Sequence, residues 1–236
     1  MSELARLGVW VTEPPGAVHV HLPGNASRLR DPGLMIQRFD PASGCVLHWE
    51  RAVGSDAGAR VSTVDAVFQA MSCQPLHDAI ATVDSAVRKG LIRLADLRPH
   101  ATERELAILA RVDGRADSGL ETLVREPLRE ARLRVEPQYP IRGVADIDLL
   151  VEGWVAVELN GRSFHTGAVA PRDRRRDAIV ASFGLTPLTF DYAQVVHDRI
   201  SVIRAIAGAV VAHRNVRGSG RRRALRLLRA SATRAS

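Results

Sequence analysis

The sequence predicts an α/β protein in two parts: a smaller, mainly helical α+β module over residues 1–113, and a domain over residues 117–213 in which strands and helices alternate. Three observations support this fold class. The composition, 46% hydrophobic and 25% charged, is that of a folded chain. Helical patterns with capping signals recur from residue 62 onward. Two apolar segments, 143–151 and 153–160, alternate with the period of two that is typical of strands.

The first module begins with residues rich in proline and glycine. Short alternating stretches there predict strands at 18–22, 34–39 and 46–50. A capping signal at Ser62 predicts a helix that runs to about Met71. A second helix is opened by Pro75 and stopped by Gly90, and a more polar helix is expected over 102–112.

The second domain begins after residues 114–119, a turn-rich segment that predicts the domain boundary. Ser118 can cap a helix with one apolar face, which has to kink at Pro127 or accommodate it. The two strands named above follow, and then a helix from Pro171 to Gly184. The domain is completed by a strand at 186–190 and by a final helix whose apolar stripe consists of Val196, Ile200, Ile203, Ala207 and Val210.

No apolar run approaches the roughly 20 residues that a membrane span needs. Residues 1–11 carry acidic and basic side chains and no apolar core of a signal peptide, so we expect a cytoplasmic protein without a membrane partner. The two cysteines, Cys45 and Cys73, lie far apart and outside any CxxC motif. This spacing argues against a disulfide framework and against a zinc knuckle.

The net charge of +7 comes from residues 217–236, within the C-terminal tail at 214–236. Seven arginines and no acid lie within 217–236, and the remaining 26 bases equal the 26 acids of the chain. Such a run fits phosphate groups, or it is a solvated, disordered tail. Lys89 is the only lysine, which indicates the codon bias of a GC-rich genome, so richness in arginine is by itself a weak sign of nucleic-acid binding.

Four polar residues interrupt the two apolar strands: Asp146, Asp148, Glu158 and Asn160. A two-residue turn would set the acids opposite valines, whereas a three-residue turn centred on Gly153 pairs 148 with 158 and 146 with 160. The second register is favoured, because it gathers the polar groups on one face and the large aliphatic residues on the other. Opposed carboxylates repel unless a cation lies between them, and oxygen ligands suit Mg²⁺ or Mn²⁺. The alternative is a solvated polar face.

Other candidate residues lie around these strands. Glu121 is in the first turn of the helix after Ser118, where it either interacts with the helix dipole or assists the acids. His165, in the loop after the second strand, is either a general base or proton shuttle or an ordinary surface residue. The helix that begins at Pro171 carries arginines in its first turns, which either bind a phosphodiester or pair with Asp173 and Asp177. These arginines are Arg172, Arg174, Arg175 and Arg176.

Several short motifs in residues 117–213 carry a family resemblance. They are Leu120-Glu121, Asp148-Leu-Leu-Val151, Val157-Glu158-Leu-Asn160-Gly161 with Phe164-His165, Arg172-Asp173 with Arg176-Asp177, and Gly184 before Leu188-Thr-Phe190. Their order and spacing resemble those of the very-short-patch-repair-like endonuclease domains. These domains belong to the restriction-endonuclease-like PD-(D/E)XK superfamily, and actinobacterial members are common.

The resemblance implies a mixed sheet flanked by helices and a catalytic metal held by Asp148 and Glu158. It also implies that Glu121, on the helix, assists these two acids. His165 matches a histidine that is frequent in this branch. The usual lysine of the last motif is Asn160 here, and asparagine cannot supply a cation to aid the nucleophile. Either His165 or an arginine takes that role, or the fold keeps DNA binding and has lost cleavage.

The first module carries a weaker resemblance. Residues 60–67 and 78–97 are similar to the region that precedes such domains in antitoxin-like regulators related to abortive-infection systems. That region is linked to a winged-helix DNA-binding domain, and the N-terminus here is too short for a complete one. The resemblance implies a winged-helix-like module that positions DNA or binds a partner.

We therefore expect an Mg²⁺-dependent or Mn²⁺-dependent DNA endonuclease or nickase, active on phosphodiester bonds in repair or defence, with duplex DNA as its partner. The backbone contacts are assigned to the arginines of the helix at Pro171 and to Arg221, Arg222 and Arg223 of the tail. The alternative is a DNA-binding transcriptional regulator or antitoxin-like protein on an inactive nuclease fold. A third reading is a small interaction protein. Each of these three hypotheses is compatible with a protein partner or with a homo-oligomer.

Overall fold

The computed structural model of the chain consists of two compact units, Met1–Gly114 and Arg115–Ser236. It describes residues 1–12, 16, 18–22, 44–49, 52–54, 60–141, 146–161, 171–213, 222, 223 and 226, with the side chains of 171–176 excepted. The boundary between the units falls within the segment 114–119 that the sequence predicts as a linker. Among the helices of this described part, none has the length and apolar character needed to cross a membrane.

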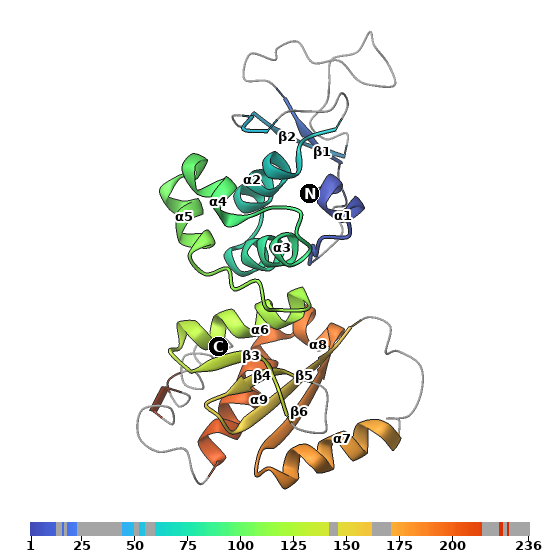
Figure 1. Cartoon of the computed structure of the whole chain (residues 1–236), viewed down its shortest axis with the longest axis vertical. Helices are drawn as coiled ribbons and strands as arrows, with labels where there is room; N and C mark the ends of the chain where they lie inside the picture. The colour runs from blue at the N-terminus through green and yellow to red at the C-terminus, as the bar shows by residue number, and fades with distance from the viewer. Residues whose placement is uncertain are drawn as a thin grey trace. The chain divides into compact units, whose positions relative to one another are not determined.

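Unit 1 is mainly helical (Figure 1). Its elements are α1 (Ser2–Arg6), β1 (Val18–His21), β2 (Cys45–His48), α2 (Thr63–Cys73), α3 (Leu76–Arg88), α4 (Leu94–Leu97), the 3₁₀ helix η1 (Arg98–His100) and α5 (Glu103–Leu109). The strands β1 and β2 form a parallel pair. Ser62 caps α2 as predicted, because its side chain accepts a hydrogen bond from the Asp65 backbone N–H. The predicted strand at 34–39 lies outside the described residues.

The core of unit 1 is formed by apolar side chains of its helices. Leu4 of α1, Met71 of α2, Ile80 of α3 and Ile108 of α5 are all fully buried in it. The sheet pair β1–β2 has no third strand among the described residues. Because an isolated two-stranded sheet is marginally stable at best in water, this pair depends on what attaches it to the helices.

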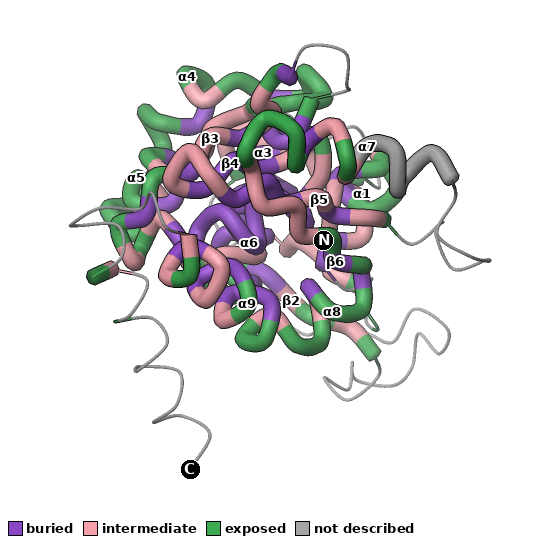
Figure 2. The backbone as a smooth tube through the Cα atoms, turned by 90° about the horizontal axis from the view of Figure 1, so that it is seen from below, coloured by how far each residue is buried: buried purple, intermediate pink, exposed green. Residues whose placement is uncertain are grey.

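Unit 2 holds a four-stranded mixed sheet in the order β3-β4-β5-β6. Its elements are α6 (Gly119–Glu130), β3 (Val135–Tyr139), β4 (Ile147–Val151), β5 (Val155–Asn160), α7 (Pro171–Ser182), β6 (Thr186–Asp191), α8 (Tyr192–His197) and α9 (Arg199–Ala212). The β3–β4 and β4–β5 pairs are antiparallel, and β5–β6 is parallel. The expected α/β class is therefore confirmed. Figure 2 shows α6 buried for most of its length, and this helix continues through Pro127.

The β4–β5 hairpin has the register that the sequence favours. Leu149 pairs with Val157 and Val151 with Val155, so three residues form the turn. Glu152 and Gly153 adopt positive φ values of 51° and 76° in this turn, and the Trp154 N–H donates to the Val151 carbonyl at 3.1 Å. The six large aliphatic residues of one face are buried: Ile147, Leu149, Val151, Val155, Val157 and Leu159.

The expectation of a single final helix is wrong. The chain breaks at Asp198 into α8 and α9, because the Asp198 carboxylate accepts a hydrogen bond from the Ser201 N–H and caps α9. The predicted apolar stripe is also wrong at Ile200, which is 55% exposed. The buried face of α9 consists of Val202, Ile203, Ile206, Ala207 and Val210.

Candidate functional site

Glu121 is held at the start of α6 by a capping box with Ser118. Its Oε1 atom accepts hydrogen bonds from the Ser118 N–H at 2.9 Å and from the Ser118 hydroxyl at 3.1 Å. Its Oε2 atom accepts from the Asp117 N–H at 3.1 Å. The side chain is 2% exposed, so this carboxyl group is fixed in position by the helix terminus and removed from bulk water.

Gln138 joins β3 to this carboxyl group. Its Nε2 atom donates to Glu121 Oε2 at 2.8 Å. The pairs Pro137 with Leu149 and Tyr139 with Ile147 set Gln138 opposite Asp148 on the neighbouring strand. Gln138 has a left-handed φ of 52°, an uncommon conformation for a residue other than glycine. Gln138 is not among the residues predicted from the sequence, because its relation to Asp148 depends on the pairing of β3 with β4.

Asp148 and Glu158 face each other across the hairpin when the observed register is continued by one residue pair. Both side chains are half-buried, and Asp148 Oδ2 accepts a hydrogen bond from the Leu159 N–H at 2.7 Å. The same sheet face carries Leu150 and Ala156, which are both buried. This face is therefore partly covered at the position of the two acids, unlike a freely solvated polar surface.

The pKa of Glu121 shows that the acidic groups influence one another. This pKa is raised from 4.5 to about 7, mainly by burial and additionally by the negative charge of Asp148. The hydrogen bonds from Gln138, Asp117 and Ser118 act in the opposite direction. Glu121 thus exchanges its proton near neutral pH, and the negative potential around Asp148 is one of the reasons.

A divalent cation fits the chemistry of Asp148 and Glu158, since hard cations such as Mg²⁺ and Mn²⁺ prefer carboxylate oxygens. A positive ion would also relieve the repulsion that contributes to the raised pKa of Glu121. Glu121 itself does not complete a three-ligand set. Within the described residues, the trio of His, Cys, Asp or Glu side chains with donor atoms all within 4.8 Å of one another lies in unit 1. Binding by Asp148 and Glu158 stays a prediction.

The remaining predicted residues are placed as follows. Asn160 is half-buried at the end of β5, where its partner in the register is Asp191 of β6, and Asp146 is exposed just before β4. In the tail, Arg222 is exposed and Arg223 is half-buried. His165, Arg221 and the side chains of Arg172, Arg174, Arg175 and Arg176 lie outside the described part of the chain.

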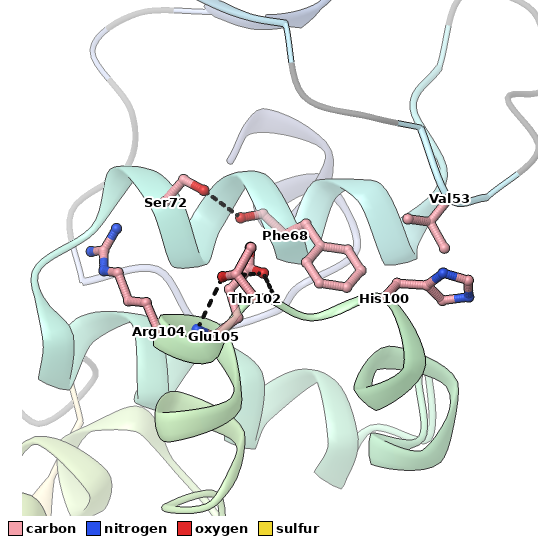
Figure 3. Close-up of a pocket in the computed structure, with 7 residues that line it drawn as sticks. All are labelled: Val53, Phe68, Ser72, His100, Thr102, Arg104 and Glu105. Carbon is pink, nitrogen blue, oxygen red and sulfur yellow. Dashed lines mark hydrogen bonds between the residues drawn. The ribbon is translucent and has the colours of Figure 1, made fainter.

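A pocket of unit 1 is lined by side chains of α2, of α5 and of the segments beside them (Figure 3). Its lining residues are Val53, Phe68, Ser72, His100, Thr102, Arg104 and Glu105. Two of its polar groups already serve the α5 cap, because Glu105 Oε2 accepts from the Thr102 N–H at 2.7 Å and from the Thr102 hydroxyl at 2.8 Å. The Ser72 hydroxyl donates to the Phe68 carbonyl. These groups maintain helix structure, so the acids of unit 2 are the stronger candidate site.

A second polar cluster in unit 1 consists of His19, His48 and Cys73. The pKa of His19 is lowered from 6.5 to about 4, mainly by burial and further by the positive charges of the Met1 amino group and His48. The cysteine spacing did not predict this cluster, because its members come from three separate segments. No single stretch of sequence carries a signal for it.

Comparisons of the chain with protein families, with curated proteins and with solved structures give no match.

Proposed function

We propose that the protein is a metal-dependent DNA endonuclease or nickase with its active site at the β4–β5 hairpin of unit 2. The observation that carries this proposal is the hairpin register, which sets Asp148 opposite Glu158 within two otherwise apolar strands. The buried Glu121, whose pKa responds to Asp148, adds a third acid from a different element. Acids gathered in this way on a partly buried sheet face are typical of a metal site rather than of a packing surface.

In this proposal Asp148 and Glu158 would hold Mg²⁺ or Mn²⁺, and the bound ion would polarise the scissile phosphate and activate a water molecule. The hydrogen bond from the Leu159 N–H fixes the orientation of the Asp148 carboxylate. Glu121 accepts a hydrogen bond from Gln138, the residue opposite Asp148 in the register, and its pKa near 7 allows it to take up or release a proton at neutral pH. His165 is the second candidate for proton transfer.

The proposed contacts with duplex DNA are electrostatic. Arg172, Arg174, Arg175 and Arg176 are assigned to the phosphate backbone, and the tail adds affinity without sequence preference. Deleting residues 217–236 removes seven arginines, so we expect weaker binding at low salt and a smaller dependence of the affinity on salt concentration. Fluorescence anisotropy with a labelled duplex measures both quantities. Equal salt slopes for the full and shortened chains would remove the tail from the proposal.

Plasmid cleavage in the presence of Mg²⁺ or Mn²⁺ tests the catalytic part. We expect Asp148→Asn and Glu158→Gln each to reduce nicking more than about 100-fold, because each removes a negatively charged metal ligand. Glu136→Gln is the matched control, since Glu136 lies in β3 of the same sheet, pairs with Leu150 and is outside the proposed site. Cleavage that survives both site substitutions would refute the assignment.

The second candidate function is a DNA-binding regulator or antitoxin-like protein on an inactive nuclease fold. It is favoured by Asn160, which stands at the position where the resembling nucleases carry a lysine and which cannot provide a positive charge. The same assay separates the two functions. Tight duplex binding without cleavage by the wild-type chain in either metal would favour the regulator.

A further inference from the structure

Three side chains with metal-binding chemistry converge in unit 1, and each comes from a different element. His19 lies in β1, His48 ends β2, and Cys73 ends α2. His19 Nδ1 lies 2.9 Å from His48 Nε2, and Cys73 Sγ lies 3.4 Å from His48 Nε2 and 3.9 Å from His19 Nδ1. The three donor atoms therefore form a closed triangle.

The size of this triangle matches the spacing of ligands around zinc. Zinc–nitrogen bonds of about 2.05 Å and a zinc–sulfur bond of about 2.3 Å at tetrahedral angles place two nitrogens about 3.3 Å apart and a nitrogen and a sulfur about 3.6 Å apart. The observed distances of 2.9, 3.4 and 3.9 Å lie within a few tenths of an ångström of these values. Cys73 Sγ also lies 3.7 Å from His48 Nδ1, beside the imidazole ring, so binding requires the His48 ring to turn until Nε2 points to a centre shared with the sulfur.

Hydrogen bonding alone accounts poorly for the triangle. His48 Nε2 is in contact with both His19 Nδ1 and Cys73 Sγ, yet a neutral imidazole nitrogen offers either one proton or one lone pair. It can therefore form one good hydrogen bond of the two. A single cation at the centre accepts a lone pair from all three atoms at once. The imidazole rings of His19 and His48 lie within 19° of parallel with their centroids 5.1 Å apart, so the two nitrogens face each other across 2.9 Å.

We propose that His19 Nδ1, His48 Nε2 and Cys73 Sγ bind a zinc ion that attaches the β1–β2 pair to helix α2. Cys73 binds as the thiolate and releases its proton to solvent, and three protein ligands leave the fourth tetrahedral position to water or to an added ligand. Thiolate and imidazole ligands favour zinc over the hard cation Mg²⁺. The site is thus chemically distinct from the acids of unit 2, and the inference does not depend on the proposed nuclease function.

A structural role follows from the position of the ligands. The strands β1 and β2 are four residues each, and such a pair has little stability of its own. The three ligands join both strands to the last residue of α2, whose helix packs in the core of unit 1. Zinc would therefore stabilise the attachment of the sheet to the helices.

Cobalt substitution of the full chain tests the proposal. After treatment with a chelator, Co²⁺ is added, and we expect one equivalent to give a thiolate-to-cobalt charge-transfer band with intense tetrahedral d–d bands, both displaced by Zn²⁺. Cys73→Ser should abolish the charge-transfer band, and His48→Ala should weaken binding at least tenfold. Cys45→Ser is the matched control, because Cys45 is the other free cysteine and lies outside the triangle. A charge-transfer band unchanged in Cys73→Ser would overturn the proposal.

Thiol alkylation provides a second measurement that needs no variant. Iodoacetamide labelling followed by mass spectrometry reports the two cysteines separately. We expect Zn²⁺ to slow the alkylation of Cys73 at least tenfold and to leave the rate at Cys45 unchanged, because a metal-bound thiolate is no longer available as a nucleophile. Equal rates at Cys73 with and without saturating Zn²⁺ would overturn the proposal.

Discussion

Glu121 should make the protein less stable as the pH rises from about 4.5 to about 7. Its pKa is about 7 in the folded chain, against an ordinary value of 4.5. Below pH 4.5 both the folded and the unfolded chain hold the proton. Between the two values the unfolded chain has released it and the folded chain has kept it, so rising pH favours unfolding until the folded pKa is passed. Each pH unit between the unfolded and the folded pKa changes the free energy of unfolding by about 1.4 kcal/mol. The total loss of stability is therefore limited to about 3 kcal/mol.

The assay is urea unfolding of the wild-type chain and of Glu121→Gln at a series of pH values. The difference between the two free energies of unfolding removes the contributions of the other titrating groups. Loss of hydrogen bonds to Asp117 and Ser118 adds a constant offset, so the change of the difference with pH is the informative quantity. We expect the wild-type chain to lose about 3 kcal/mol relative to the variant between pH 4.5 and pH 8.

A matched control comes from the capping box of α5. Glu105→Gln alters the corresponding carboxylate at the start of that helix, where Glu105 is less buried than Glu121. This variant measures how the loss of a capping carboxylate by itself changes the free energy of unfolding. A difference between wild type and Glu121→Gln that stays flat with pH, or that rises, would refute the argument that burial and Asp148 raise the pKa of Glu121.

Three further predictions concern stability, each measured by urea unfolding. Gly153→Ala should lower the free energy of unfolding by about 1–2 kcal/mol, because φ is 76° there and an added Cβ would lie 3.2 Å from Arg134 Nη2. Gly161→Ala is the control, because its Cβ meets nothing within 4 Å, and an equal loss there would contradict this reasoning. Leu149→Ala, at a fully buried position of β4, should cost about 2–5 kcal/mol, and a cost below 1 kcal/mol would show that the face is not packed as described. Asp198→Ala should cost about 1 kcal/mol by removing the cap of α9, and a stabilised variant would indicate one continuous helix instead.

The local parts of the fold could be predicted from the sequence because their causes are local. The Ser62 cap of α2, the helix from Pro171 and the strand at 186–191 follow from residues that are close together in the chain. The hairpin register was also predictable. Alternating polar and apolar residues in both strands admit one pairing that buries the whole aliphatic face, and Gly153 supplies the turn that this pairing requires.

Asp198 shows where a local pattern failed. Apolar residues continue on both sides of it at helical spacing, so the pattern predicts one helix. The structure ends α8 there, because the aspartate side chain accepts a hydrogen bond from the Ser201 N–H in the first turn of α9. Whether the helix continues through Asp198 or a new helix begins there depends on whether Ile200 or Val202 faces the core. That core is formed by segments distant in the sequence.

The sequence by itself determined most of the longer helices and strands and the opposition of Asp148 to Glu158, since each of these depends on neighbours within a few residues or across one tight turn. Only the tertiary structure decided that Gln138 of β3 donates a hydrogen bond to Glu121 of α6 and that His19, His48 and Cys73 meet. Those contacts depend on how strands and helices pair over long separations. No periodicity or spacing along the chain predicts that pairing, because the pairing is set by the packing of whole elements against a common core.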